Sequence, residues 1–221
     1  MADSHRPMRI DIVSDVVCPW CIVGYQQLRC ALENTGVQAE FHWHPFELNP
    51  DMPAQGELLR DHIMRKYGTS AEESEHNRDR LCAIGAELGI DFRFDEQSRI
   101  YNTFDAHQLM HWADSQSRKH DLKLALLHDY FTAQRDVSDR AVLVESATDV
   151  GLDQSEAHAV LDEQRFADTV RRNERLWVSR GIQGVPAIIL EQRYLLSGAQ
   201  GVENFTAAVR QTLSGNHGGS Q

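Results

Sequence analysis

The chain has 221 residues, of which 41% are hydrophobic, and its formal net charge at neutral pH is −11. This length and composition predict a packed globular protein of one large or two small domains. The acidic balance argues against nucleic acid and anionic membranes as partners. We expect a cytoplasmic protein, because no apolar run has membrane-spanning length and Met1–Pro7 lacks the apolar core of a signal peptide.

A reactive motif follows the first β-branched run of the chain. Ile10–Val17 predicts a strand, Cys18-Pro19-Trp20-Cys21 follows it directly, and Ile22–Leu32 predicts a helix. Proline is favoured at the first helical position, so we expect Cys18 at the helix N-cap as an exposed thiol. The helix dipole favours the Cys18 thiolate, and Cys21 lies one turn further on. The motif therefore predicts an attacking thiol, Cys18, and a resolving thiol, Cys21.

A zinc site is the structural alternative for such a cysteine pair. Structural zinc takes four ligands, usually from two pairs, but Cys30 and Cys82 stand alone, and His42 and His44 lie on a predicted strand. We therefore expect no metal, and we interpret Cys30 and Cys82 as small buried hydrophobic residues.

A second strand and a long helical block come next. Gln38–Phe46 predicts a strand parallel to the first, because a helix connects the two. From Gly56 to about Arg180 the pattern predicts one helix after another. The expected helices are Gly56–Tyr67, Ser70–Leu88 with a capping box at Ser70 and Glu73, Thr103–Gln116, Asp121–Ala133, Asp139–Val150, Ser155–Gln164 and Phe166–Ser179.

Within this block, Asn102–His107 groups polar and aromatic residues at the start of a helix. Helix starts bind anions, so the stretch is a candidate for substrate binding. The favoured interpretation is that Asn102 or Thr103 only caps the helix. The histidines of the block are interpreted mainly as surface or internally bonded residues.

Strand character returns after Gly181. Gly184–Leu190 predicts a central strand that tolerates Pro186 at its beginning, and a turn leads to a further strand at Tyr194–Ser197. A closing helix is expected at Gly201–Leu213, followed by a frayed tail at Gly215–Gln221.

Cys18-Pro19-Trp20-Cys21 after a first strand, together with Val185-Pro186 before a late strand, resembles the thioredoxin-fold thiol oxidoreductases. The helical insertion is similar to that of the DsbA family, and Asp15–Gly24 with Asn102–His107 resembles its FrnE-like branch. The resemblance implies an α/β thioredoxin-like fold. Residues 1–53 and 181–221 would form the thioredoxin-like domain, and residues 54–180 an all-helical insertion between its second and third strands.

The resemblance also implies roles for residues. Cys18 would be the nucleophile, Cys21 the resolving thiol and Val185–Pro186 a cis peptide bond beside an extended substrate, with an ordinary trans proline as the alternative. The candidate substrate-binding residues are Pro19, Trp20, Asn102, Thr103, His107, Val185 and Pro186.

One position departs from the family pattern. Many thioredoxin-fold enzymes bury an acid six residues before the nucleophile, where this chain has Ile12. Asp15 lies nearer to the thiols and is expected at a turn or facing solvent, so proton transfer would rely on water.

The sequence therefore favours a dithiol–disulfide oxidoreductase acting on protein or small-molecule thiols and disulfides, as a monomer or homodimer. In the cytoplasm, reduction or isomerisation is the expected direction, with no cofactor beyond the cysteine pair and with glutathione as a candidate co-substrate. One alternative is a glutathione transferase or a 2-hydroxychromene-2-carboxylate isomerase of the same fold, although Cys21 argues against it. A non-enzymatic holdase with an apolar groove near Trp20 is another.

Overall fold

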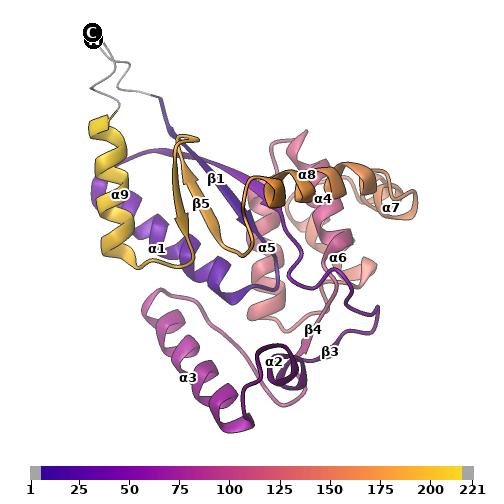
Figure 1. Ribbon diagram of the computed structural model, residues 1–221. Helices are drawn as coiled ribbons and strands as arrows, with labels where there is room; N and C mark the ends of the chain where they lie inside the picture. Colours follow the sequence, from indigo (N-terminus) through magenta and orange to yellow (C-terminus); the bar gives the residue numbers. More distant parts are fainter. Residues whose placement is uncertain (1–5, 216–221) are drawn as a thin grey trace.

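A four-stranded sheet lies at the centre of the protein, whose computed structural model describes residues 6–215. The strand order is β2-β1-β5-β6, with β1 parallel to β2 and antiparallel to β5, and β5 antiparallel to β6. The strands are β1 (Met8–Ser14), β2 (Ala39–Pro45), β5 (Ala187–Leu190) and β6 (Tyr194–Ser197). The sheet therefore combines the two ends of the chain (Figure 1).

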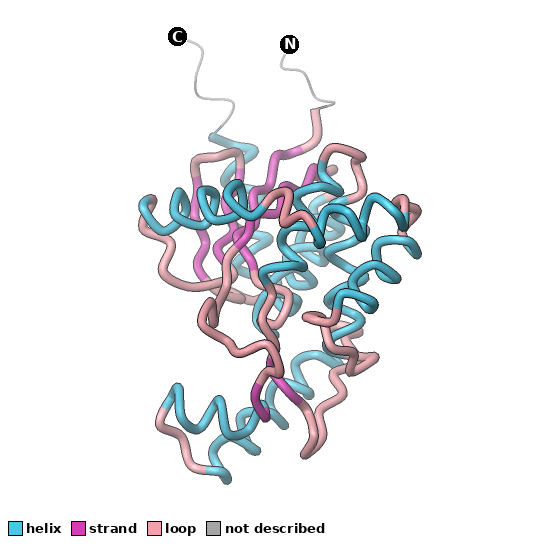
Figure 2. The backbone as a smooth tube through the Cα atoms, turned by 90° about the vertical axis from the view of Figure 1, so that its right-hand side faces the viewer, coloured by secondary structure: helices cyan, strands magenta, loops and turns pink. Residues whose placement is uncertain are grey.

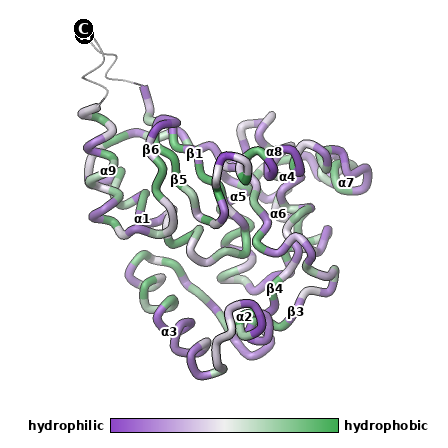
Figure 3. The backbone as a smooth tube through the Cα atoms, viewed as in Figure 1, coloured by the Kyte–Doolittle hydropathy of each residue, from purple (hydrophilic) through white to green (hydrophobic). Residues whose placement is uncertain are grey.

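Two helices cover one face of this sheet. They are α1 (Pro19–Thr35) and α9 (Val202–Gly215), which lie side by side in Figure 1. Ile10 and Ile12 of β1 face these helices and share a buried core with Leu28 and Phe205. The apolar run of β5 continues this core, and the hydrophobic colour along β5 in Figure 3 marks it. Alternation along β1 thus sends every second side chain towards α1 and α9.

The other face of the sheet meets the insertion. Val13 of β1 packs with Trp177 of α8 (Ala167–Ser179), which also contacts β2. The remaining helices of the insertion are α2 (Leu59–Tyr67), α3 (Ala71–Glu87), α4 (Phe104–Asp114), α5 (Lys119–Phe131), α6 (Arg140–Asp149) and α7 (Gln154–Asp162). The helices α4 to α7 pack around one core that includes Leu109, Leu126 and Leu143. None of the helices in the described part of the chain combines the length and the apolarity that crossing a membrane requires.

The helices α2 and α3 extend below the rest of the molecule (Figures 1 and 2). The capping box predicted for α3 is present: Glu73 N–H donates to Ser70 Oγ at 3.1 Å, and Ser70 N–H donates to Glu73 Oε2 at 2.8 Å. A short antiparallel pair, β3 (Glu57–Leu58) and β4 (Arg99–Ile100), joins this arm to the insertion core. The expected all-helical insertion therefore also contains two short strands, which are too short to show a periodic pattern.

Most expected elements are present, with shifted boundaries. The parallel pairing of the first two strands is confirmed. The first strand ends at Ser14 rather than Val17, and the first helix begins at Pro19. Cys30 and Cys82 are half-buried rather than buried. Of the expected frayed tail, Gly215 ends α9, and residues 216–221 lie outside the described part of the chain.

Candidate active site

The cysteine pair occupies the first turn of α1. Cys18 is the N-cap residue, Pro19 follows at the first helical position, and Cys21 N–H donates to Cys18 O at 3.0 Å. The expected exposure of Cys18 is wrong, because only 3% of its surface is accessible. The loop before β5 covers the thiol, which donates to Val185 O at 3.6 Å. Trp20, between the two cysteines, is 44% exposed.

The loop that covers Cys18 contains the expected cis peptide bond at Val185–Pro186. It packs closely on α1 at Gly24, where an added Cβ would lie 3.1 Å from Pro186 Cγ. Glycine at this position therefore lets the loop approach the helix that carries both thiols.

Cys21 lies in a polar pocket beneath Cys18. The Ser14 side chain, the Asp15 backbone and the Lys123 ammonium are the polar groups around its sulfur. Burial opposes ionisation of Cys21, but the hydrogen bond from Cys18 and the charge of Lys123 lower its pKa below the ordinary value. The same hydrogen bond, followed by burial, raises the pKa of Cys18. The two thiols therefore titrate as one coupled pair, and the positive charge of Lys123 favours ionisation within this pair.

Lys123 of α5 is the unusual member of this pocket. Its side chain is 1% exposed, and Nζ has no hydrogen-bond partner among the described residues. Nζ lies 5.4 Å from the centroid of the Trp43 ring. Burial lowers the pKa of Lys123 to about 8, against the opposing charges of Cys21 and Asp15. A buried ammonium without hydrogen bonds is costly, and the thiolate and carboxylate beside it offset this cost.

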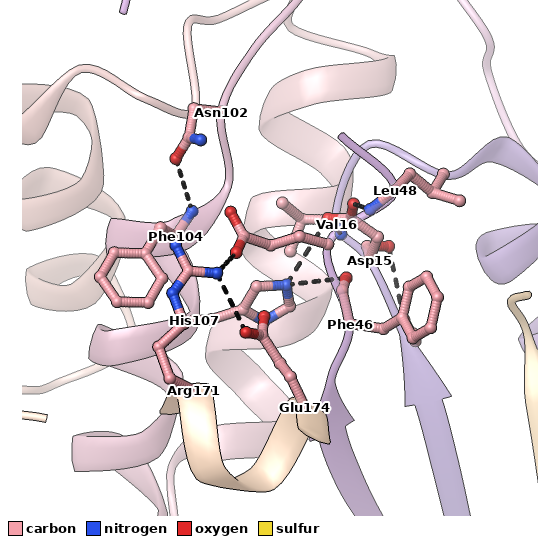
Figure 4. A network of polar contacts seen from close by, with 11 residues as sticks. Asp15, Val16, Phe46, Leu48, Asn102, Phe104, His107, Arg171 and Glu174 are labelled. Atoms are coloured by element: carbon pink, nitrogen blue, oxygen red, sulfur yellow. Dashed lines mark hydrogen bonds and ion pairs between the residues drawn. The ribbon is translucent and has the colours of Figure 1, made fainter. Parts of the chain in front are cut away.

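Asp15 is buried as well rather than facing solvent, and it directly precedes the turn at residues 16–17, where the alternative expectation placed it. Its carboxylate accepts the Val16 N–H and the Leu48 N–H, both at 2.7 Å, and lies 3.6 Å from His107 Nε2 (Figure 4). Burial opposes its ionisation, but His107, the Leu48 amide and Lys123 lower the pKa of Asp15 below the ordinary value. These bonds also end β1 early, because the side chain captures the next backbone amide. A buried carboxylate therefore stands beside the thiols, although the family position for an acid holds Ile12.

A second cluster of charged side chains lies next to Asp15 and His107. His107 Nε2 lies 3.2 Å from Phe46 O, and the next residue, Glu47, is paired with Arg171 (Figure 4). Arg171 also contacts Glu174 at 3.1 Å, so one cation serves two carboxylates. Burial, then the charge of Glu174, raises the pKa of Glu47 to about 8. One carboxylate of this cluster therefore holds a proton at neutral pH.

The helix start at Asn102–His107 has a structural role. Asn102 Oδ1 accepts the Phe104 N–H at 2.9 Å and so caps α4, as the favoured interpretation predicted (Figure 4). Thr103 is buried at the N-cap, and the His107 ring faces Asp15. None of the three residues lines the cleft beside Cys18.

That cleft has a volume of about 600 Å³ and lies between the first turn of α1 and the arm formed by α2 and α3. Of the predicted substrate-binding residues, Pro19, Trp20 and Val185 line it together with Cys18. Pro186 lines a neighbouring hollow that also includes Val185. Within residues 6–215, no three His, Cys, Asp or Glu side chains are grouped so that they could hold a metal ion.

Comparison with known proteins places this geometry in a family. A model of the "DSBA-like thioredoxin domain" matches residues 9–210. The chain belongs to the DSBA-like thioredoxin domain family. A probable DsbA oxidoreductase from Streptomyces coelicolor is 36% identical, with a TM-score of 0.86 and coverage of 94% of this chain and 90% of that chain.

Two further relatives of this DSBA-like chain are more distant. The uncharacterized protein YwbO of Bacillus subtilis is 25% identical over 91% of this chain and 96% of its own length. The cytosolic disulfide reductase DsbM from Pseudomonas aeruginosa, solved with GSH, is 16% identical with a TM-score of 0.63, and the match covers 93% of this chain and 99% of that chain. The DsbM likeness shows the shared fold alone.

The charged groups around the thiols of this DSBA-like chain were not predicted from the sequence. Lys123 carried a signal: with Leu126, Leu127 and Tyr130 it occupies one buried stripe of α5, where a lysine is out of place. No such signal marks Glu47 in the sequence, because its burial depends on contacts with α8, which follows it by more than a hundred residues.

Proposed function

We propose that this DSBA-like chain is a dithiol–disulfide oxidoreductase acting on thiol- or disulfide-containing substrates. The observation that carries the proposal is the position of the cysteine pair. Cys18 lines the cleft and donates to Val185 O, and Cys21 lies one helical turn further on, close to Ser14, Asp15 and Lys123. A substrate sulfur can therefore reach Cys18 from the cleft, and only Cys18 separates it from the resolving thiol.

In the reducing direction, the proton shared by the thiols moves to Cys21 and the Cys18 thiolate attacks a substrate disulfide. A bond forms between Cys18 and one substrate sulfur, and the other substrate sulfur leaves as a thiolate. Cys21 then loses its proton and attacks Cys18, which releases the second substrate thiolate and leaves the Cys18–Cys21 disulfide. Two electrons pass from the protein to the substrate. The one proton that the thiol pair held is released, and the two substrate thiolates take up protons from solvent according to their own pKa values.

The charged pocket favours this second step. Lys123, Ser14 and the Asp15 amide stabilise the Cys21 thiolate, which lowers the cost of ionising Cys21 before it attacks. In the reverse direction they make Cys21 a better leaving group when a substrate thiolate attacks Cys18. The same three groups therefore assist both oxidation and reduction of a substrate. The redox potential of the cysteine pair determines which direction is favoured.

We place the activity in the cytoplasm, as a reductase or isomerase of the FrnE-like branch, working as a monomer or homodimer. Similarity to a cytosolic disulfide reductase supports this assignment, as do the Asp15–Gly24 and Asn102–His107 stretches. Glutathione is the proposed co-substrate that reduces the Cys18–Cys21 disulfide.

The test is equilibration of the purified protein in glutathione buffers of graded ratio, with trapping of free thiols and location of the disulfide by mass. We expect a Cys18–Cys21 disulfide, and a mixed disulfide on Cys18 that accumulates in Cys21→Ser. A potential near roughly −270 mV would mark a reductant, and one near roughly −120 mV an oxidant. A pair that never forms the disulfide would overturn the proposal.

The glutathione transferase or isomerase alternative predicts a different pattern. Such an enzyme needs one nucleophilic position and no resolving thiol, so Cys21→Ser would keep full activity on small organic substrates. The placement of Cys21 behind Cys18 in a pocket that stabilises its thiolate argues for the oxidoreductase.

A further inference from the structure

The cleft beside Cys18 is basic although the chain is acidic. Lys and Arg number 22 against 33 Asp and Glu in the whole sequence. The cleft lining nevertheless includes Arg60, Lys66, Arg78 and Arg80 and no Asp or Glu. Among the described residues, Lys66, Arg78 and Arg80 have no acidic partner within 4 Å. The cleft that contains the reactive thiol is therefore lined by an excess of positively charged side chains.

The walls of the cleft are largely apolar. Ile63, Leu81, Phe94 and Phe131 line its interior. Two aromatic rings that also line it, Trp20 and Tyr67, are 44% and 60% exposed, which is unusual for residues of this size. These rings offer flat surfaces to a ligand that enters the cleft.

Two polar side chains, Lys66 and His62, lie among the apolar walls of the cleft. Lys66 Nζ donates to Leu48 O at 2.9 Å and to Asn49 Oδ1 at 2.7 Å, which ties α2 to the loop after β2. Lys66 lines the same cleft as Cys18. His62 is buried beside the cleft, where Nδ1 lies 2.9 Å from Glu57 Oε2 and Nε2 has no partner among the described residues.

We propose that the cleft selects small disulfides and thiols that combine an apolar, preferably aromatic, body with a carboxylate. This inference rests on the proposed oxidoreductase function. A volume of about 600 Å³ matches a small molecule rather than a folded partner. The apolar walls bind the body, the basic side chains attract the carboxylate, and the substrate sulfur lies against Cys18. The positive charge of the cleft also speeds the encounter with anions.

The experiment measures how fast the reduced protein reacts with four disulfides. Dithiobis(nitrobenzoate) is an aromatic dianion and dithiodipyridine an uncharged aromatic of similar shape. Oxidised glutathione is anionic but polar, and cystamine is cationic and aliphatic. Each rate is divided by that of the same disulfide with a small free thiolate, so that intrinsic reactivity cancels. In each reaction, one equivalent of protein dithiol becomes the Cys18–Cys21 disulfide, and the probe disulfide becomes two thiols.

We expect the normalised rate of the aromatic dianion at low salt to exceed that of the uncharged aromatic by about tenfold. Oxidised glutathione and cystamine should be slower than both. Added salt should reduce the preference for the dianion, because it screens the basic side chains. Equal normalised rates for the two aromatic disulfides would overturn the proposal.

Charge-reversal variants test whether the preference for the aromatic dianion comes from the basic side chains of the cleft. Arg78→Glu should slow the aromatic dianion by roughly threefold or more relative to the uncharged aromatic. Arg175→Glu is the matched control, because Arg175 is exposed on α8, outside the cleft, and the change in net charge is the same. An equal effect of both variants would show only a whole-protein charge effect and overturn the proposal. Tyr67→Ser, at an exposed position, should slow both aromatic disulfides.

Failure of the proposed function has a separate signature. If none of the four disulfides oxidises the cysteine pair, the oxidoreductase function and the cleft proposal both fall. If all four oxidise it at similar normalised rates, the oxidoreductase stands and the selectivity of the cleft is overturned.

Discussion

The Lys123 ammonium and the Cys21 thiol form a buried pair that joins the two parts of the fold. Lys123 comes from α5 of the insertion and Cys21 from α1 of the thioredoxin-like part, and each is 1% exposed. The charge of each group shifts the pKa of the other. The helical insertion therefore does more than enlarge the molecule, because it supplies a positive charge beneath the resolving thiol.

Replacement of this lysine should make the protein more reducing. Lys123→Met removes the charge that stabilises the Cys21 thiolate, so the reduced form loses stability relative to the disulfide. We expect the apparent thiol pKa to rise by about one unit and the redox potential to fall by about 30 mV. The pH dependence of alkylation measures the first change, and equilibration with glutathione the second.

The effect on stability should depend on the redox state. In the oxidised protein Cys21 carries no charge and Asp15 is the anion that remains near Lys123, whereas in the reduced protein both groups interact with it. We therefore expect Lys123→Met to lose more unfolding free energy in the reduced than in the oxidised protein. Lys119→Met, one turn earlier on α5, is the control, because Lys119 pairs with Asp114 at 3.3 Å. Equal potentials for the wild type and Lys123→Met would contradict an electrostatic role.

Asp15→Asn should shift the pKa of the thiols and the redox potential in the direction opposite to Lys123→Met. The Asp15 carboxylate is negative and raises the pKa of Cys18, after the larger effects of Cys21 and burial. The amide keeps the shape and removes the charge, so we expect a lower thiol pKa and a less negative potential. The free energy of unfolding should fall by about 1–3 kcal/mol, because the amides of Val16 and Leu48 lose a charged acceptor. A shift in the same direction as in Lys123→Met would contradict this assignment.

The order of the elements was predictable because local patterns determine it. The β-branched run before Cys18, the proline after it and the capping box at Ser70 each act within a few residues of the chain. The cysteine pair could be placed for the same reason. Its site depends on one strand, one turn and one helix that are consecutive in the sequence.

The surroundings of the thiols could not be predicted in this way. Cys18 is buried by Val185, which follows it by 167 residues, and Asp15 is buried by contacts with Leu48 and His107. Lys123 had a local signal, but its position on a buried stripe does not say which group it faces. Charge and exposure at this site thus result from tertiary contacts between the insertion and the sheet.

Glu47→Gln should change how stability depends on pH. The pKa of Glu47 is raised to about 8, from an ordinary value near 4.5, so between these values the folded protein holds a proton that the unfolded chain releases. This group therefore lowers stability as pH rises from about 4.5 to 8. Glutamine removes the effect, and we expect thermal unfolding to show little difference from wild type at pH 5 and a gain of about 1–2 kcal/mol at pH 8. A constant difference across this range would contradict the prediction.

Asp11→Asn tests the buried carboxylate within β1, on the face that also carries Val13. Asp11 accepts hydrogen bonds from Arg9 at 2.7 and 2.8 Å and lies 2.8 Å from His44 Nε2. Burial opposes ionisation, but these partners hold the pKa of Asp11 well below its ordinary value. The stabilisation is therefore present above about pH 4 and is lost as pH falls through the folded pKa. We expect the variant to lose about 2–3 kcal/mol of unfolding free energy at pH 7 and less in acid, whereas exposed Asp61→Asn should change it by under about 0.5 kcal/mol. Denaturant unfolding between pH 3 and 7 measures this, and an equal loss at both ends would show that packing, not charge, is responsible.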